Sequence, residues 1–520
     1  MKNGGENEKQ FEPDLEKDSI INDRYTIKNK IGEGGFSKVY VVLDKENNNE
    51  EYACKILLEK RAQTDTKTFF NEIKILKKLT ENLIINNYVS KFHDSGIGDI
   101  KNNKNLLISK GRHYLINTYY PKKNLLIYLD KTEEGLEEKE AKILFSKILK
   151  SVQFIHNSGI CHLDIKLDNF IFDDHYNPVI IDFGLSYEME KDDKNEFKPI
   201  KDKELKGTSY YICPQMWTYR DYNGIKADIF GLGVVLFYLV TKKFSFDIAC
   251  RKDNSYKLIC LNKPSTIEEF WKKISEINPK ILSLSPEFKE LFFKLIAYNE
   301  KRRPNSIQEI LDDPWVNDIN NFTNNDYLEY ENKMKNLEKK IEQDNETIEI
   351  NQTQENNNNN LDTNFKSSNN FDYEKEIFFA PNIISNYLSM SGFNAMNYIK
   401  IKGELKPDKF MNSLANILKQ KYKCEITPYI NNFILEVIFP NKLKEKLDNM
   451  DDIDGEEEIE DFNLEKFEFK DCLIKIELFE HINGGYEIHF TKGKGEFLDY
   501  YSYFQEIKII IKNILHSIKR

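Results

Sequence analysis

The 520-residue chain has few cysteines, and they lack the spacing that would pair them. The seven cysteines are scattered and odd in number, and no two form a C-x-x-C pair. Disulfide frameworks and zinc sites depend on paired or closely spaced cysteines. The sequence therefore favours reduced thiols over either kind of site.

Long apolar runs and a leader segment are also missing. No run approaches the roughly 20 apolar residues of a membrane-spanning helix. The N-terminal stretch MKNGGENEKQFEPD is polar and mixed in charge, unlike a signal peptide. We therefore expect a cytoplasmic protein, with a nuclear or membrane-peripheral location left open.

An excess of basic residues is absent as well. The formal net charge of −11 argues against nucleic acid as a partner, although a local basic face stays open. With 40% hydrophobic and 31% charged residues over 520 positions, the chain has the composition and length of two globular cores and a linker.

One stretch carries the residue types that phosphoryl transfer needs. The motif H-x-D-x-K-x-x-N begins at His162, and D-F-G begins at Asp182. Asp164 can orient an attacking hydroxyl and accept its proton, and Lys166 can neutralise charge on the moving phosphoryl group. Asn169 and Asp182 offer the hard oxygen ligands that Mg2+ prefers. The sequence therefore predicts phosphoryl transfer from a nucleotide.

These two motifs resemble the catalytic and magnesium-binding segments of eukaryotic protein kinases. Further pieces of that family's pattern occur in order over residues 25–316. They are a glycine-rich stretch at 31–40, a strand with Lys55 at 51–57, a helix with Glu72 at 68–79, a hinge-like strand at 113–120, a buried helix that begins near Asp228, and an Asp313-Pro314-Trp315 ending similar to the H-P-W of calcium/calmodulin-dependent and AMP-activated-type kinases. The resemblance implies an α+β, bilobal fold with a β-rich N-lobe and a helical C-lobe.

The resemblance also implies ATP and Mg2+ as cofactors and protein serine or threonine hydroxyls as substrates. Lys55, paired with Glu72, would position the nucleotide, while Asp164 and Lys166 would act at the substrate hydroxyl. The residues expected at the nucleotide are Ile31, Gly32, Glu33, Gly34, Gly35, Val39, Ala53, Lys55, Thr118, Tyr120, Asn169 and Asp182. The last two of these would hold the metal.

Several positions depart from the family pattern. Ser37 replaces the third glycine, and Asn124 replaces an acid near the ribose. Polar Asn117 lies where the depth of the nucleotide pocket is set. Gln215 replaces the acid that ends the activation segment, so an amide would meet Arg303 there and hold it more weakly.

Leu163 replaces the arginine that grips an activation-segment phosphate in most relatives. Leucine cannot bind a phosphate on Thr208 or Ser209, so we expect competence without phosphorylation there. The alternative is that Leu163 only packs the loop and a nearby lysine binds the phosphate. Residues 188–205 are expected to be charged and flexible, and Thr208 favours serine/threonine over tyrosine substrates.

The extent of the kinase resemblance and the change of composition after it together predict the domain boundaries. They are a flexible N-terminus at 1–24, a kinase domain at 25–316, an asparagine-rich linker at 317–372 and a second domain at 373–520. Within the linker, Tyr327–Ile348 has the pattern of a charged helix. Its mixed charge and few large apolar anchors favour a solvated spacer over an autoregulatory helix or calmodulin target.

The order of strand and helix patterns in residues 373–520 predicts a small α+β domain with an antiparallel sheet and a final helix. Its order and position resemble the kinase-associated domain of microtubule-affinity-regulating and AMP-activated-type kinases. Basic residues there would bind anionic lipid if they converge on one face, although the acidic loop at 451–461 opposes this. They are Lys400, Lys402, Lys492, Lys494, Lys512, Lys519 and Arg520.

Two other functions stay open. One is a pseudokinase scaffold without turnover, which Leu163, Ser37 and Gln215 favour. The intact set of acid, lysine and amide positions opposes it, namely Lys55, Glu72, Asp164, Lys166, Asn169 and Asp182. The other makes the C-terminal domain the main functional element, as a membrane-binding or partner-binding module.

Overall fold

The computed structural model describes most of the chain up to residue 343 and the main elements of a second unit. The described residues are 14–33, 37–58, 66–81, 87–193, 197–201, 207–218, 221–343, 347–349, 398–402, 407–429, 434–439, 472–480, 486–492, 507, 510, 511 and 514. The chain divides into two compact units, of which the first holds residues 36–337 and the second most residues from 338 onward.

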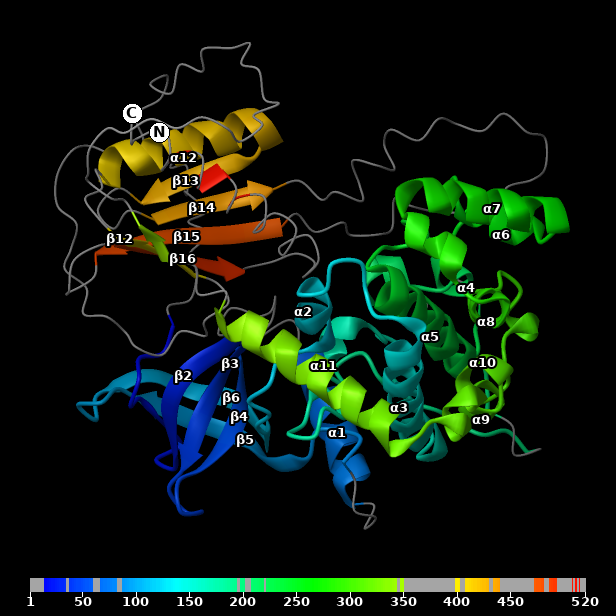
Figure 1. Cartoon of the computed structure of the whole chain (residues 1–520). Helices are drawn as coiled ribbons and strands as arrows, with labels where there is room; N and C mark the ends of the chain where they lie inside the picture. The colour runs from blue at the N-terminus through cyan, green and yellow to red at the C-terminus, as the bar shows by residue number, and fades with distance from the viewer. Residues whose placement is uncertain are drawn as a thin grey trace, which may run out of the picture. The chain divides into compact units, whose positions relative to one another are not determined.

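Residues 20–118 form a closed β-barrel with one helix beside it (Figure 1). The elements are β1 (Ile20–Ile21), β2 (Tyr25–Glu33), β3 (Ser37–Asp44), β4 (Glu50–Leu57), α1 (Thr66–Glu81), β5 (Phe92–Lys101) and β6 (Leu107–Thr118). The order is β1-β2-β3-β4-β6-β5, and β1 closes the barrel because it pairs with both β2 and β5. Alternate residues of paired strands, Tyr40 and Val42 on β3 and Cys54 and Ile56 on β4, fill its core.

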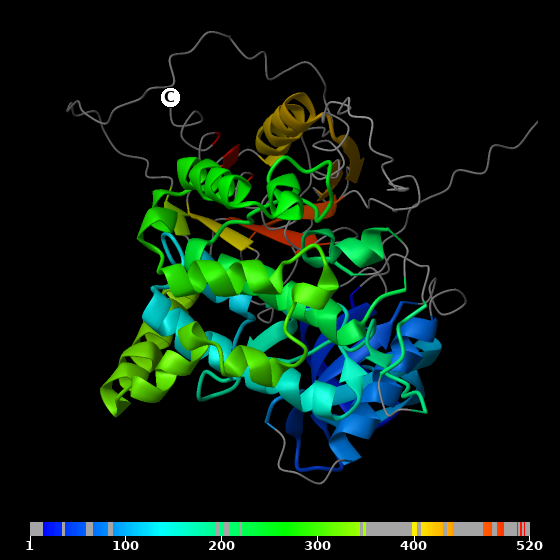
Figure 2. The same ribbon diagram turned by 90° about the vertical axis from the view of Figure 1, so that its right-hand side faces the viewer.

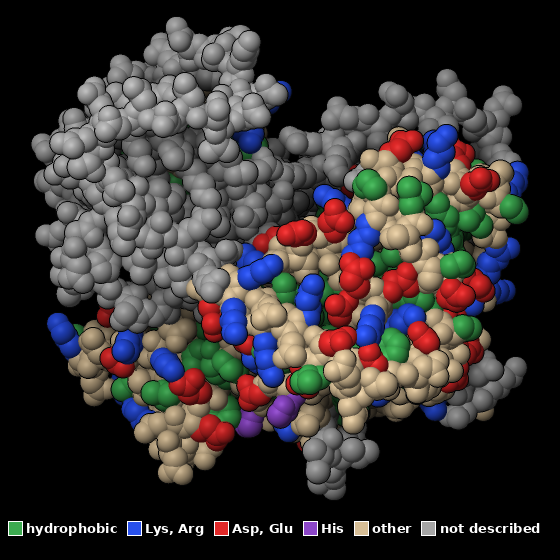
Figure 3. All heavy atoms as spheres, viewed as in Figure 1, with side chains coloured by type: hydrophobic (Ala, Val, Ile, Leu, Met, Phe, Trp, Pro, Cys, Tyr) green, Lys and Arg blue, Asp and Glu red, His purple; other side chains and the backbone are tan. Residues whose placement is uncertain are grey.

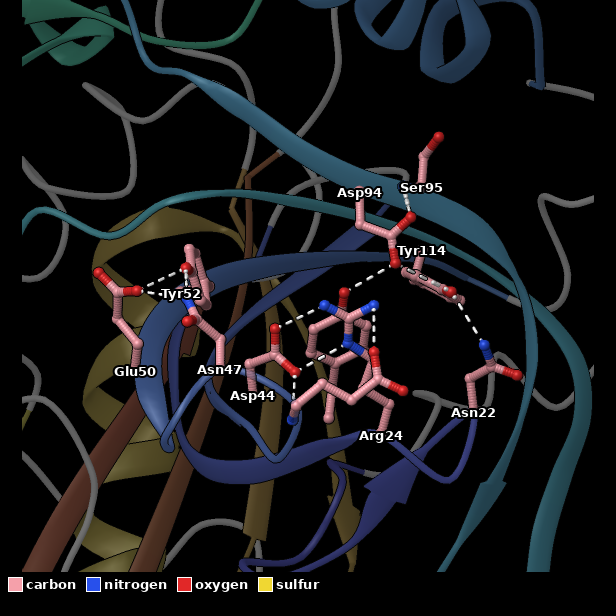
Figure 4. A network of polar contacts seen from close by, with 11 residues as sticks. Asn22, Arg24, Asp44, Asn47, Glu50, Tyr52, Asp94, Ser95 and Tyr114 are labelled. Carbon is pink, nitrogen blue, oxygen red and sulfur yellow. Dashed lines mark hydrogen bonds and ion pairs between the residues drawn. The ribbon is translucent and has the colours of Figure 1, made fainter.

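Polar side chains hold the barrel where β1 meets its neighbours (Figure 4). Tyr25 Oη donates a hydrogen bond to Asp94 Oδ2 at 2.7 Å, and Asn22 Nδ2 donates to Tyr114 Oη at 3.1 Å. A Cβ atom on Gly98 would lie 2.6 Å from the Cβ of Asn22, so the close approach of β5 requires glycine. Closure thus depends on residues far apart in the sequence.

Residues 125–317 form a mainly helical lobe beside the barrel (Figures 1 and 2). Its helices are α2 (Leu125–Asp130), α3 (Glu138–Asn157), α4 (Pro214–Trp217), α5 (Gly224–Thr241), α6 (Tyr256–Leu261), α7 (Pro264–Ile277), α8 (Pro286–Leu295), α9 (Ile307–Leu311) and α10 (Pro314–Asn317). Two short strand pairs lie among them, β7 (Ile160–Cys161) with β10 (Tyr187–Glu188) and β8 (Phe170–Phe172) with β9 (Pro178–Ile180).

Helix α5 is the apolar centre of the helical lobe. Among the described residues it is the one helix long and apolar enough to cross a membrane, which corrects the expectation that no stretch reaches this limit. Of the 18 residues of this helix, 89% are buried inside the protein. A helix covered by neighbours on every side is apolar all round, and this explains its composition.

The helix α11 (Asn324–Gln343) packs on the helical lobe, so the expectation of a solvated spacer is wrong for this part of the linker. Tyr330, Met334 and Leu337 are 1%, 1% and 3% exposed. Tyr330 Oη donates to the carbonyl of Tyr176 at 3.1 Å, and Lys147 Nζ lies 4.8 Å from the centre of the Tyr330 ring. These anchors recur at helical spacing, but the charged residues between them dilute the pattern. Acidic and basic side chains are interspersed on the face of the first unit that Figure 3 shows.

The second unit contains a six-stranded sheet in the order β11-β12-β16-β15-β14-β13. The elements are β11 (Thr347–Glu349), β12 (Tyr398–Lys402), α12 (Pro407–Tyr422), β13 (Glu425–Tyr429), β14 (Ile434–Phe439), β15 (Cys472–Glu480) and β16 (Tyr486–Lys492). All pairs are antiparallel except β11 with β12. Helical residues at the spacing of one face, Ile507, Ile510, Ile511 and Ile514, are buried where the final helix is expected. The side chains of the proposed lipid-binding residues lie outside the described residues.

Candidate active site

Lys55 lies at the centre of an ion-pair cluster that joins β4, α1 and the D-F-G segment. Its Nζ is 2.6 Å from Glu72 Oε2 and 3.2 Å from Asp182 Oδ1. Burial raises the pKa of the Glu72 carboxyl, whereas the neighbouring Lys55 lowers the pKa of Asp182 to about 2. Although burial opposes it, the two carboxylates raise the pKa of the Lys55 ammonium. Lys55 and Asp182 therefore stay charged at neutral pH.

Asp164 is almost fully buried and its carboxylate is held from three sides. Thr208 donates to Oδ1 from its backbone nitrogen at 3.1 Å and from its hydroxyl at 2.9 Å. Asn169 Nδ2 lies 3.1 Å and Lys166 Nζ 2.8 Å from Oδ2. Lys166 Nζ also donates to Thr208 Oγ1 at 2.6 Å. This arrangement fixes both oxygens of a carboxylate that can accept a proton.

Asp228 at the start of α5 braces the loop that carries Asp164. Its Oδ2 accepts hydrogen bonds from the backbone nitrogen of His162 at 2.7 Å and from His156 Nε2 at 2.8 Å. Its Oδ1 accepts one from the backbone nitrogen of Leu163 at 2.7 Å. Leu163 has a φ of +61°, a left-handed conformation that costs a non-glycine residue about 1–2 kcal/mol. Asp228 therefore holds a strained backbone in place.

Gln215 meets Arg303 as the sequence predicts. Arg303, 1% exposed, donates from Nη2 to Gln215 Oε1 at 2.7 Å. It also donates to the carbonyls of Ala297 and Lys226, at 2.9 and 3.0 Å. Gln215 in turn donates from Nε2 to the carbonyl of Tyr298 at 2.7 Å, which a carboxylate could not do. The amide is thus fitted to its surroundings on both sides.

Three of the residues expected at the nucleotide share one face of the barrel, namely Val39, Ala53 and Lys55. In the strand register Val39 lies opposite Lys55, and Ala53 lies opposite Asn117. Side chains directly opposite each other in a sheet point to the same face. Ile31 and Gly32 lie just before the end of β2, Thr118 is the last residue of β6, and Tyr120 lies two residues beyond it. All four are partly exposed. Gly34, Gly35 and the side chain of Glu33 lie outside the described residues.

Comparison with known sequences decides the family. A protein kinase domain profile matches residues 25–316. The chain belongs to the protein kinase family.

The kinase has distant curated relatives of the calcium/calmodulin-dependent group. It is 32% identical to mouse "Sperm motility kinase Z" over 182 residues, 35% of this chain and 32% of the relative. It is 29% identical to "CBL-interacting serine/threonine-protein kinase 13" of Arabidopsis thaliana over 44% of this chain and 41% of the relative. It is 28% identical to "Probable serine/threonine-protein kinase MARK-A" of Dictyostelium discoideum over 56% of this chain and 24% of the relative. These matches span less than half of each relative.

The kinase fold and the expected order of a β-rich lobe and a helical lobe are thereby confirmed. The segment at 188–205, expected to be flexible, is ordered at its start because Glu188 lies in β10 and the Met189 nitrogen donates to the Gly159 carbonyl at 2.8 Å. Ile200 is buried and pairs with Tyr222.

Two oxygen groups of the kinase domain fit a magnesium ion. Asp182 is half exposed, and its Oδ1 lies 3.2 Å from Lys55 Nζ and accepts a hydrogen bond from the backbone nitrogen of Gly184 at 3.4 Å. The Asn169 amide nitrogen is committed to Asp164, which leaves its carbonyl oxygen to meet a cation. The described residues contain no cluster of three or more His, Cys, Asp or Glu that could hold a metal. Two protein ligands, completed by phosphates and water, are typical of Mg2+.

Two contacts of the kinase site escaped the sequence interpretation. Thr208 was linked to substrate preference, but its hydrogen bonds to Asp164 were not foreseen. The hydrogen bond between His156 and Asp228 was not predicted either. A polar residue at a buried helix position next to the catalytic loop was the available signal.

Proposed function

We propose that this protein is a serine/threonine protein kinase that transfers the γ-phosphate of ATP to protein hydroxyls. The observation that carries the proposal is the Asp164 carboxylate, fixed by Thr208, Asn169 and Lys166 near a charged Lys55–Asp182 pair. These groups supply a proton acceptor and charge stabilisation, which phosphoryl transfer requires.

In the proposed reaction the substrate hydroxyl oxygen forms a bond to the γ-phosphorus of ATP. The bond from that phosphorus to the oxygen of the ADP leaving group breaks, and Asp164 accepts the hydroxyl proton. Lys166 offsets charge on the transferred group, while Lys55 positions the nucleotide phosphates. Mg2+, held by Asn169 and Asp182, would neutralise phosphate charge.

Thr208 supports the preference for serine and threonine. Its hydroxyl accepts from Lys166 and donates to Asp164, so it closes the space beside the proton acceptor. We propose that a short aliphatic hydroxyl reaches Asp164 in this arrangement.

We also propose that the kinase is competent without activation-segment phosphorylation. Leu163 offers no cation for a phosphate. Thr208 and Ser209 are 5% and 2% exposed, and the Thr208 hydroxyl is already engaged by Asp164. These contacts assemble the catalytic loop from unmodified side chains.

The remaining proposals concern the second unit and the cell. We propose domains at 25–316 and 373–520, with the latter a kinase-associated-like regulatory domain, and a cytoplasmic location. The second unit combines a sheet that is antiparallel except for the β11–β12 pair with helix α12, which lies between β12 and β13 in the sequence. This supports an α+β regulatory unit. Binding of this unit to anionic lipid is the weaker proposal, since the described residues supply no surface for it.

The experiment measures transfer of labelled phosphate to a generic basic protein by full-length protein made in a host without activating kinases. Mass spectrometry first confirms that no phosphate is present. We expect Mg2+-dependent activity, and a loss on the order of a hundredfold or more for Lys55→Met, Asp164→Asn and Asp182→Asn. Lys45→Met, an exposed lysine on the same lobe, is the matched control.

Different outcomes contradict different parts of the proposal. Near-normal activity in all three variants would contradict catalysis by this site. No activity in wild type under any condition would favour the pseudokinase scaffold. Activity only after phosphorylation of Thr208 or a neighbour would refute the proposal on Leu163 alone.

A further inference from the structure

We propose that Glu188 is a positioning residue, a permanent anion that docks helix α1 onto the activation segment without any phosphate. This inference rests on the proposed competence without phosphorylation and names the group that provides it. The Glu188 carboxylate receives two ammonium groups of α1, with Lys78 Nζ 2.7 Å from Oε1 and Lys74 Nζ 2.8 Å from Oε2. Both oxygens are therefore used, one by each lysine.

The rest of the same helix face supports this docking. Asn71 Nδ2 donates to the carbonyls of Gly184 and Ser186, at 3.1 and 2.8 Å. A Cβ atom on Gly184 would lie 2.9 Å from the Thr68 methyl group, so the segment runs directly against α1. Residues 68, 71, 74 and 78 recur every three or four positions and so share one helix face. The helix thus follows the segment over residues 184–188.

The position of α1 decides whether the nucleotide lysine has its partner. Glu72 belongs to α1 and is the residue that meets Lys55 at 2.6 Å. If α1 moved away from the segment, this pair would separate and a buried carboxylate would lose its cation. Glu188 therefore stabilises the Lys55–Glu72 pair without touching it.

Glu188 is also tied to the catalytic loop. It lies in β10, opposite Ile160 of β7, and β7 ends at Cys161, one residue before His162. His162 and Leu163 are held by Asp228, and Asp164 follows. One side chain thus links the helix that carries Glu72 with the strand that leads into the catalytic loop.

Charge, rather than packing, carries this contact. Glu188 is 37% exposed, and Lys78 and Lys74 are 39% and 68% exposed. Among the described residues, Glu188 is the only acidic partner of either lysine. Partly exposed ion pairs contribute modestly and are screened by salt, so the expected effect on activity is also modest and salt-dependent.

The test compares Glu188→Gln with wild type as phosphate-free, full-length protein. We expect kcat/KM for ATP to fall about three- to tenfold at low salt. The difference from wild type should shrink as salt rises, and amide hydrogens of α1 should exchange faster. The control variant is Lys67→Glu, which reverses the charge of an exposed lysine elsewhere on α1. Its activity should stay near that of the wild type.

Charge reversal separates docking from a general effect on folding. Glu188→Lys should be more damaging than Glu188→Gln, and adding Lys74→Glu and Lys78→Glu to it should restore much of the activity. If Glu188→Lys does not fold, Lys74→Gln with Lys78→Gln tests the same contact from α1. Full activity of Glu188→Gln in an active, phosphate-free kinase would overturn this inference alone. Wild-type protein that stays inactive even after phosphorylation would instead overturn the proposed function.

Discussion

The brace at Asp228 allows a quantitative test of how the catalytic loop is held. Asp228 is 1% exposed and accepts three hydrogen bonds, from His156, His162 and Leu163. In Asp228→Asn an NH2 group replaces one carboxylate oxygen. Its N–H donors then face the N–H donors of the neighbouring residues, where an acceptor stood before. At least one charge-assisted hydrogen bond is lost and one buried donor is left unpaired.

The expected cost of Asp228→Asn follows from those two losses. A hydrogen bond to a charged group contributes about 1.5–3 kcal/mol, and a buried unpaired donor costs about 1–3 kcal/mol. We therefore expect a loss of about 3–5 kcal/mol in the free energy of unfolding. Activity should fall as well, because Asp164 follows directly on the loop that Asp228 fixes.

Leu163→Gly should partly rescue the variant. Glycine adopts the left-handed conformation of residue 163 without the cost of about 1–2 kcal/mol that leucine bears. The double variant with Asp228→Asn should therefore be about 1 kcal/mol more stable than Asp228→Asn alone. A gain of this size would show that the backbone at residue 163 is strained.

The assay is urea unfolding followed by tryptophan fluorescence. The chain has three tryptophans, Trp217, Trp271 and Trp315, and all lie in the first unit, so the signal reports that unit alone. Phosphate transfer is measured on the same samples. The reasoning is refuted if Asp228→Asn costs less than 1 kcal/mol or if Leu163→Gly does not stabilise the Asp228→Asn variant.

Two further expectations concern α11 and Glu188. Met334→Asp should detach α11, at a cost of about 2–5 kcal/mol, and expose it to limited proteolysis, whereas Leu328→Asp, at a position 52% exposed, should not. Equal proteolysis of both variants would contradict the packing of α11. Because Lys74 and Lys78 lower the pKa of Glu188 from 4.5 to about 2, its stabilising effect should be complete above pH 4.5 and be lost as the pH falls toward 2. The difference in unfolding midpoint between wild type and Glu188→Gln, measured from pH 7 to 3, should therefore shrink below pH 4.5, and a constant difference would argue against it.

The sequence by itself determined the chemistry of the site, because that chemistry depends on residue types at short spacing. Asp164, Lys166 and Asn169 lie within six positions on one loop, and Asp182 follows after a short strand pair. Helix α1 and strand β4 were also predictable, since their apolar periodicity is strong and local. The pairing of Lys55 with Glu72 needed the family pattern as well, because the two residues lie on separate elements.

Tertiary structure alone decided the contacts in which a weak local pattern finds a distant partner. Glu188 looked like part of a flexible charged stretch, and only the approach of α1 gives its carboxylate two cations. In the sequence, Tyr330 and Met334 are isolated apolar residues among charged ones. Only the tertiary structure shows that they are buried against the helical lobe. Barrel closure by β1 is of the same kind, because pairing of a two-residue strand is fixed by its neighbours, not by its own sequence.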